Sequence, residues 1–94
     1  MFEAEKSDSG EILLVGRFDA SQVEGAIKVF DTIMESCNIN FSDLDYISSA
    51  GLGILLKTQK RLSESGEKLK LTHMNKHIKD VFQYAGFDTI FEIE

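Results

Sequence analysis

The chain has 94 residues, of which 43% are hydrophobic, and its formal net charge at pH 7 is -6. A chain of this length and apolar content is expected to form one domain over residues 1 to 94, with a single core. Cys37 is the only cysteine, which excludes an intramolecular disulfide and a zinc cluster built from cysteines. No apolar run approaches the roughly 20 residues of a membrane span, and no signal peptide is recognisable, so we expect a cytoplasmic protein without membrane insertion.

The charge is distributed unevenly along the chain. Residues 1 to 45 carry ten acidic and three basic side chains, whereas residues 46 to 94 carry six acidic and seven basic ones. All seven of these bases lie between Lys57 and Lys79, where Glu64 and Glu67 interrupt them and no aromatic platform accompanies them. This pattern favours a solvated helix face over direct nucleic-acid binding.

Two strands are expected to open the chain. Residues 2 to 6 would pair with the apolar run at residues 12 to 15 as a hairpin, across the turn formed by residues 7 to 10. The second run is apolar throughout and is bounded by Gly10 and Gly16, which is typical of a strand buried on both faces. The hairpin predicts an antiparallel edge for the sheet.

A first helix is indicated by apolar residues that recur at helical spacing. The members of this stripe are Val23, Ala26, Ile27, Phe30, Ile33 and Met34. Asp19 and Ser21 are candidate N-caps. The pattern predicts that the helix ends near Glu35 or Ser36.

A strand and a second helix follow. Cys37, Ile39 and Phe41 alternate with polar residues, which predicts a strand. The second helix is expected to begin near two consecutive serines and to end at the Ser-Gly pair of residues 65 and 66. Its buried stripe is expected to be Leu52, Leu55, Leu56, Gln59 and Leu62.

The rest of the chain repeats this alternation. Leu69 and Leu71 indicate a strand, a third helix runs from about Asn75 to Gly86, and a short strand covers residues 90 to 93. The apolar face of the third helix is expected to be Ile78, Val81, Phe82 and Ala85. The order ββαβαβαβ predicts an α/β fold with a mixed, mostly parallel sheet and helices packed against it.

The segment most informative about function is the run from residue 45 to residue 56, Asp-Tyr-Ile-Ser-Ser-Ala-Gly-Leu-Gly-Ile-Leu-Leu, where a strand passes into the second helix. Ser48 and Ser49 can each cap that helix, and a phosphate on either would lie at the positive end of the helix dipole. Gly51 and Gly53 would each cost about 1 kcal/mol relative to Ala inside a helix. They indicate a close approach to a strand, a frayed first turn, or a bare backbone that a partner can approach.

Three stretches carry a family resemblance. Residues 15 to 20, Val-Gly-Arg-Phe-Asp-Ala, are similar to a Gly-x-Leu-Asp turn before the first helix, and residues 45 to 53 contain Ser-Ser-Ala-Gly-Leu-Gly. Residues 81 to 91 resemble a closing helix followed by a Gly-aromatic-Asp turn. Together, and in this order, they resemble a STAS domain of the bacterial anti-sigma factor antagonist type. The resemblance covers nearly the whole chain and implies a STAS-type single domain.

The resemblance implies a regulatory protein-binding module. In family members of this type, the unphosphorylated domain binds an anti-sigma factor that is also a serine kinase, and the sigma factor is released. The kinase phosphorylates a hydroxyl at the N-terminus of the second helix and so frees itself, and a phosphatase resets the cycle. A phosphate adds about -1.5 to -2 charges and disrupts an interface that packs there unmodified.

Ala50 departs from the family's pattern. The family places the phosphorylated hydroxyl immediately before the glycine of Asp-Ser-Ser-Gly-Leu, and that position is Ala50 here, which cannot accept phosphate. A phosphorylation switch would have to use Ser49 or Ser48. The Ala-Gly-Leu sequence also resembles STAS proteins that act as fixed adaptors, such as a subunit docked on the ATPase of a membrane transporter. A switch at Ser49 and a non-phosphorylated adaptor are therefore both open.

The partner-binding surface is expected at this junction. By resemblance it comprises Asp19, Ser48, Ser49, Ala50, Gly51, Leu52 and, on the second helix, Lys57. Lys60 and Arg61 would add charge complementarity. Asp19 should lie beside the serines, because both follow strand carboxyl ends. By resemblance it would help to position the kinase or tune the phosphate environment, and its alternative role is to cap the first helix. Asn40 stands where many relatives have an acidic residue, so it makes the pocket less negative or forms a loop hydrogen bond.

Other candidate sites are weaker. His73 and His77 have the i, i+4 spacing of a metal pair, but His73 falls before the helix and no third ligand is evident. Cys37 is typical of a small buried side chain rather than a nucleophile. The chain has no Gly-x-x-x-x-Gly-Lys loop and no Ser-His-Asp order, which disfavours a nucleotide-binding domain and an enzyme. We therefore expect no metal, no cofactor and no catalytic residue.

Overall fold

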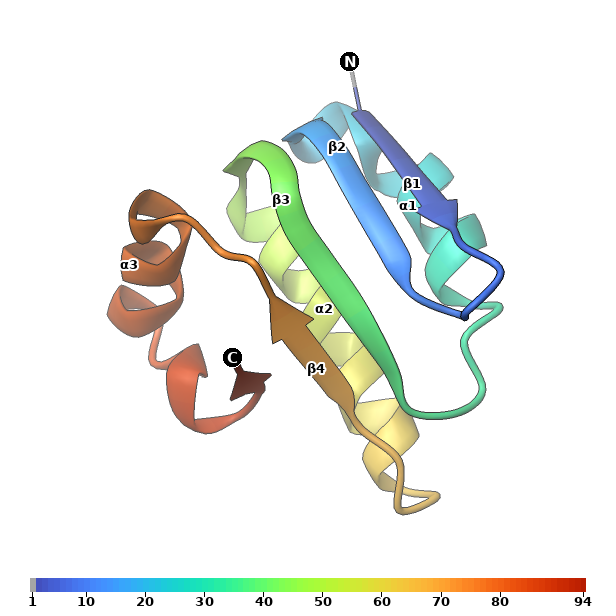
Figure 1. Cartoon of the computed structure of the whole chain (residues 1–94). Helices are drawn as coiled ribbons and strands as arrows, with labels where there is room; N and C mark the ends of the chain where they lie inside the picture. Colours follow the sequence, from blue (N-terminus) through green and yellow to red (C-terminus); the bar gives the residue numbers. More distant parts are fainter. Residues whose placement is uncertain (1) are drawn as a thin grey trace.

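The computed structural model describes residues 2–94, and Figure 1 shows its fold. The elements in chain order, with η for a short 3-10 helix, are β1 (Phe2–Lys6), β2 (Ile12–Phe18), η1 (Ala20–Gln22), α1 (Val23–Phe30), β3 (Cys37–Ile47), α2 (Ser49–Ser63), β4 (Leu69–Thr72), α3 (Lys76–Tyr84), η2 (Phe87–Thr89) and β5 (Glu92–Ile93). The predicted ββαβαβαβ order is confirmed.

The strands form one five-stranded sheet in which the spatial order follows the chain order, β1-β2-β3-β4-β5. β1 pairs with β2 in the antiparallel sense, and the other neighbouring pairs are parallel. This confirms the predicted mixed, mostly parallel sheet with an antiparallel edge. Because β2 and β3 are parallel, their carboxyl ends meet at the same edge, on the upper side of Figure 1.

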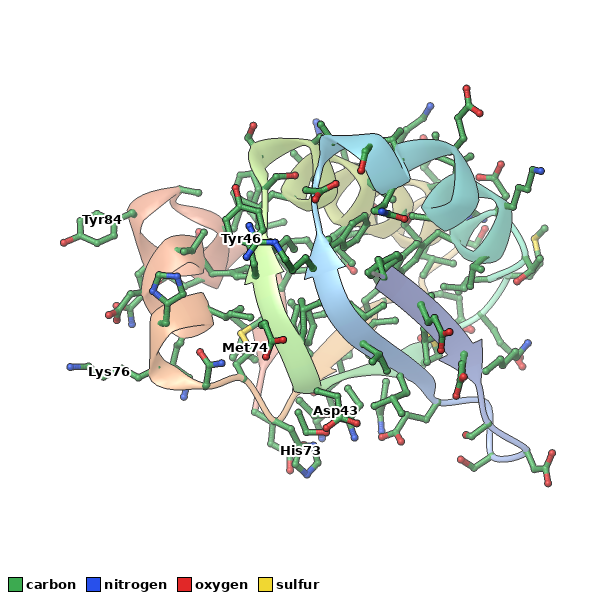
Figure 2. The ribbon with its side chains drawn as sticks, turned by 90° about the horizontal axis from the view of Figure 1, so that it is seen from above. Asp43, Tyr46, His73, Met74, Lys76 and Tyr84 are labelled. Atoms are coloured by element: carbon green, nitrogen blue, oxygen red, sulfur yellow. The ribbon has the colours of Figure 1, made fainter. Side chains whose placement is uncertain are left out.

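α1 and α2 cover one face of the sheet, behind it in Figure 1, and α3 lies beyond the β4 side. The apolar side chains between these layers form a continuous core. The rings of Phe18 and Phe30 stack with centroids 6.4 Å apart, which joins β2 to α1. Phe41 of β3 meets Phe82 of α3 edge-on at 5.9 Å. In Figure 2 Asp43 lies on the side of the sheet away from α1 and α2.

β3 is longer than the strand that the sequence predicts, and two bulges explain the difference. Along the paired stretch, β2 advances six residues, from 12 to 18, while β3 advances eight, from 39 to 47. The buried residues of β3 beyond Phe41 are Leu44 and Ile47, three residues apart. A regular strand buries every second residue, so the three-residue spacing does not match the pattern used to recognise strands. The sequence therefore did not predict the second half of β3.

α1 is shorter than predicted. It ends at Phe30 rather than near Glu35, and Met34, which we assigned to its buried stripe, is 71% exposed. Ile33 is buried from the turn that follows the helix. The carbonyl oxygens of Phe30 and Ile33 accept hydrogen bonds from the Arg61 guanidinium at 2.9 and 2.8 Å. These bonds satisfy main-chain acceptors that a longer helix would otherwise have used.

α3 matches its prediction except at its end. Ile78 and Phe82 are buried as expected, whereas Ala85 is exposed. Gly86 follows with a φ of 75°, the left-handed conformation that ends many helices. Ala85 is the C-cap residue and lies outside the regular part of the helix. The helical spacing that predicted its burial therefore does not apply to it.

The last strand is shorter than predicted. It begins at Glu92 rather than at residue 90, because Phe87–Thr89 form η2 and Ile90 belongs to the end of that turn. Across residues 2–94, the structure contains no helix with the length and apolar character needed to cross a membrane.

Candidate functional site

Ser48 is the residue between the end of β3 and the start of α2. Its main-chain N–H donates a 2.8 Å hydrogen bond to the Phe18 carbonyl, which ties the junction to the end of β2. Its hydroxyl accepts a 3.2 Å hydrogen bond from the main-chain N–H of Gly51, and its backbone is extended, as in most N-cap residues. Ser48 is therefore the cap of α2, and its hydroxyl is engaged.

Ser49 is the first residue of α2, and it is exposed. Within the described residues, no hydrogen bond engages its hydroxyl, in contrast to Ser48. The hydroxyl of Ser49 stands at the positive end of a 15-residue helix, close to main-chain N–H groups that have no partner inside the helix. As candidate caps the two serines were equivalent in the sequence, and the structure assigns the cap to Ser48.

The two glycines of the motif also differ. A Cβ atom on Gly51 would lie 2.9 Å from Cγ1 of Ile47 and 3.1 Å from Cγ of Phe18, so α2 approaches the sheet closely there. A Cβ atom on Gly53 would have no neighbour within 4 Å. Gly51 and Leu52 are buried, so in the expected contact surface they pack α2 on the sheet rather than face a partner.

Asp19 follows Phe18 at the same edge of the sheet as Ser48, as predicted from the strand carboxyl ends. Its carboxylate accepts hydrogen bonds from the Ser21 hydroxyl at 2.5 Å and from the Ser21 main-chain N–H at 3.0 Å, and so caps η1. These bonds, helped by the positive charge of Arg17, hold the pKa of Asp19 below its usual value. Asp19 therefore presents an ionised carboxylate beside the junction.

The basic residues of α2 divide into two groups. Arg61 is half-buried and donates to main-chain carbonyls at the end of α1, so it supports the structure. Lys57 and Lys60 are exposed. The ion pairs among residues 2–94 all involve Lys68 or Lys70, so Lys57 and Lys60 have no carboxylate partner in that part of the chain. Their charges are free to meet a partner.

One pair near this edge was not predicted. The Arg17 guanidinium carbon lies 4.4 Å from the ring centroid of Tyr46, which Figure 2 labels. The two residues are register partners on β2 and β3, but only after the bulges of β3 are counted. A regular pairing of β2 with β3 would not place Arg17 opposite Tyr46, so the sequence did not predict this cation-π contact.

A family model described as "Mlab, STAS domain" matches residues 1–92. The chain belongs to the STAS-domain family. This confirms the family that the motifs at residues 15 to 20, 45 to 53 and 81 to 91 indicated.

Known relatives of this STAS domain include BtrV of Bordetella bronchiseptica, which is described as an anti-sigma factor antagonist and is 38% identical over 55 residues. That match spans 58% of the chain and 47% of BtrV, about half of the relative's length. An anti-sigma factor antagonist from Mycobacterium paratuberculosis superimposes with a TM-score of 0.82 at 16% identity, covering 99% of this chain and 83% of that one.

The antagonist SpoIIAA superimposes in two forms. Its unphosphorylated form gives a TM-score of 0.73 at 19% identity, covering 100% of this chain and 87% of SpoIIAA. The phosphorylated form from Bacillus gives 0.71 at 20% identity, covering 100% and 91%. At these identities the likeness shows the fold, and it confirms the predicted STAS-type architecture.

Asn40 does not belong to the junction of this STAS domain. It pairs with Leu13 and Thr72 inside the sheet, well before the end of β3. Its side-chain oxygen accepts a 2.8 Å hydrogen bond from the Ser42 main-chain N–H. Of the two roles considered for Asn40, the structure shows the local hydrogen bond.

The remaining candidates are two histidines and a cysteine. Nδ1 of His73 lies 3.0 Å from the Thr72 hydroxyl oxygen, while His77 is exposed on α3. Within residues 2–94, no group of three or more His, Cys, Asp or Glu side chains is placed to hold a metal ion. Cys37 is half-buried at the start of β3, and burial raises the pKa of its thiol, which disfavours the reactive thiolate.

Proposed function

We propose that this STAS domain is an anti-sigma factor antagonist, a binding module rather than an enzyme. It binds an anti-sigma factor through Asp19, Ser48, Ser49, Ala50 and the exposed side of α2 at Lys57, while Gly51 and Leu52 hold the helix behind them. The observation that carries the proposal is the exposed, unengaged hydroxyl of Ser49 at the start of α2, at the edge that also holds Asp19. The description of BtrV and the fold shared with SpoIIAA support it.

The proposed binding is switched by phosphorylation of Ser49. The anti-sigma factor is the serine kinase, and a phosphatase restores the free hydroxyl. Phosphate adds about -1.5 to -2 charges, which the dipole and free N–H groups of a helix N-terminus can stabilise, so the fold persists. The interface, however, acquires negative charge beside the ionised Asp19, and the partner dissociates. SpoIIAA, which has been solved in both states, supports this reading.

Ser48 is less suited to the role of acceptor. Its hydroxyl is half-buried and already accepts the hydrogen bond of Gly51, so a kinase reaches it less easily than the exposed, unengaged hydroxyl of Ser49. A switch at Ser49 leaves this bond in place.

The test is incubation with a serine-kinase anti-sigma factor and ATP, followed by intact-mass measurement and site mapping. We expect one phosphate on the wild type and on Ser48→Ala, and none on Ser49→Ala. Phosphate mapped to Ser48, or a Ser49→Asp protein that binds as tightly as the wild type, contradicts the switch. Failure of the unphosphorylated domain to bind any anti-sigma factor contradicts the antagonist function itself.

Ala50 favours a second candidate function. Because Ala50 replaces the hydroxyl that the family phosphorylates, the same surface could dock permanently, as a non-phosphorylated adaptor on the ATPase of a membrane transporter. Under this alternative the domain copurifies with a transporter ATPase, takes up no phosphate, and keeps its binding in Ser49→Asp. Both candidates place the domain in the cytoplasm.

A further inference from the structure

A groove runs between α1 and α2, which Figure 1 shows side by side behind the sheet. Its volume is about 300 Å³, and its lining includes Ile27, Ala50, Gly53, Ile54 and Lys57. Apart from Lys57, these lining side chains are aliphatic or absent. A volume of this size is at the lower limit of typical ligand pockets, and it suits one large side chain rather than a whole cofactor.

Two of the polar side chains that line the groove, Thr58 and Arg61, are already paired with main-chain carbonyls. The Thr58 hydroxyl donates a 2.9 Å hydrogen bond to the Ile54 carbonyl, so it presents no free donor. Phe30 is buried beneath the groove, and the Arg61 guanidinium is held by the carbonyls of Phe30 and Ile33. Ile27 remains 39% exposed on the α1 side. An apolar group that enters the groove therefore leaves the Thr58 hydrogen bond and the two Arg61 hydrogen bonds in place.

Gly53 opens the groove toward solvent. Nothing lies within 4 Å of its Cβ position, so the fold does not require glycine there, unlike at Gly51. Glycine in a helix interior is unfavourable relative to alanine, so Gly53 weakens α2 without a compensating contact among the described residues. A bare main chain at this point lets another molecule approach the helix closely.

The charges beside the groove select for an acidic occupant. Lys57 lines it and Lys60 lies on the next turn of the same exposed side, and neither has a carboxylate partner in residues 2–94. Asp31 contributes one negative charge from the α1 wall. The local balance is thus positive in a chain whose net charge is -6. Two copies of this chain would each carry a net charge of -6 and repel one another, so a second copy is a poorer match than a partner that presents only a local acidic segment.

We propose that the groove receives an acidic segment of the anti-sigma factor, which inserts one large apolar side chain and pairs a carboxylate with Lys57. This inference rests on the proposed function and extends its surface. Ala50 belongs both to the junction and to the groove lining. Ser49, Gly53, Lys57 and Lys60 follow one another at helical spacing, so an occupant of the groove would also reach the Ser49 hydroxyl.

A small probe tests the groove without the partner. In an NMR titration, 3-phenylpropionate at millimolar concentration supplies one apolar ring and one carboxylate. We expect chemical-shift changes at the Ile27, Ala50, Gly53 and Ile54 amides, and weaker binding of the neutral 3-phenylpropanamide. Neither compound should bind to the Gly53→Leu variant. Gly25→Leu is the matched control, since Gly25 is equally open but is absent from the groove lining. Shifts confined to other residues, or unchanged binding in Gly53→Leu, overturn the proposal.

The anti-sigma factor provides the second arm. Gly53→Leu and Lys57→Glu should each weaken its binding about tenfold or more, whereas Gly25→Leu and the exposed Lys79→Glu on α3 should not. Equal affinity in all four variants, with tight wild-type binding, overturns the groove and the contact at Lys57 but leaves the antagonist function itself intact. If no anti-sigma factor binds the wild type, the proposed function fails and the titration alone decides the groove. Concentration-dependent dimers that Gly53→Leu abolishes would assign the groove to a second copy and overturn the proposed occupant.

Discussion

The Phe18 carbonyl accepts a hydrogen bond from the main-chain N–H of Ser48 at 2.8 Å. This bond fastens the start of α2 to the end of the neighbouring strand, so Asp19 and the serine pair lie at the same edge of the sheet. The position of the candidate site is thus set by main-chain pairing. Because this bond involves no side chain, substitution of Ser48 or Ser49 leaves it in place.

Ser48 and Ser49 should differ in stability although they are adjacent. Ser48→Ala removes the acceptor of the Gly51 N–H and should lower the free energy of unfolding by about 1 kcal/mol. Ser49→Ala removes an exposed hydroxyl that engages no described residue and should change it by less than about 0.5 kcal/mol. Urea denaturation of both variants measures the difference. Equal losses would mean that the two serines share the capping role.

The two glycines of α2 should respond to alanine in opposite directions. At Gly51 the new methyl group meets Ile47 and Phe18, and overpacking of about 1–3 kcal/mol outweighs the gain in helix propensity. At Gly53 the methyl group meets open space, so the variant should gain about 1 kcal/mol. Thermal denaturation followed by circular dichroism tests both signs, and a stabilised Gly51→Ala would contradict the close approach of α2 to the sheet.

Arg61 should be the basic residue of α2 that matters for stability. Its guanidinium donates to the carbonyls of Phe30 and Ile33, and Arg61→Met keeps much of the side-chain volume while removing these bonds. We expect a loss of about 1–3 kcal/mol. Lys60→Met, on the exposed side of the same helix, is the control and should lie within about 0.5 kcal/mol of the wild type. A small effect at Arg61 would show that water replaces the bonds without cost.

The Asp19 carboxylate should make stability depend on pH in the acid range. Its native pKa lies below the ordinary value of 3.8, chiefly because of the Ser21 hydroxyl and main-chain N–H. Its contribution is therefore fully present above that ordinary value and is lost as the pH falls through the lower native pKa. The melting temperature of the wild type should exceed that of Asp19→Asn at pH 7, and the two should converge in acid. A difference that grows on acidification would contradict this assignment.

Much of the fold could be predicted from the spacing of apolar residues. Where these predictions were wrong, the cause is local. The stripes of α2 and α3 predicted the centres of their buried faces, Leu52, Leu55 and Leu62 on α2 and Ile78 and Phe82 on α3. They were wrong at Ala85, which is exposed, and they missed the buried Thr58. The predicted end of α1 was wrong because Ile33 keeps the helical spacing of apolar residues although it lies in the turn after the helix. The hydrogen bond from Arg61 to the Ile33 carbonyl, which marks this turn, could not be read from the sequence. The second half of β3 was missed because bulges replace the two-residue period.

The candidate site was predictable to a similar degree. Strand carboxyl ends in a parallel sheet share an edge, which was enough to bring Asp19 near the serines. The sequence could not tell which serine caps α2 or which glycine faces solvent, since both depend on where the helix starts relative to Phe18. Ile27 was assigned to the buried stripe of α1, so the groove was not foreseen.

The two bulges of β3 also have a consequence for how this site can change. They lengthen β3 by the two residues that bring Ile47 opposite Phe18, and Ser48 therefore reaches its acceptor. Deletion of one residue from the bulged stretch, such as Ser42, would leave every letter of the Ser-Ser-Ala-Gly-Leu-Gly motif intact yet displace it along β2. Possession of the motif is thus insufficient for a working junction in a homologue, and the length of the preceding strand is the second condition to compare.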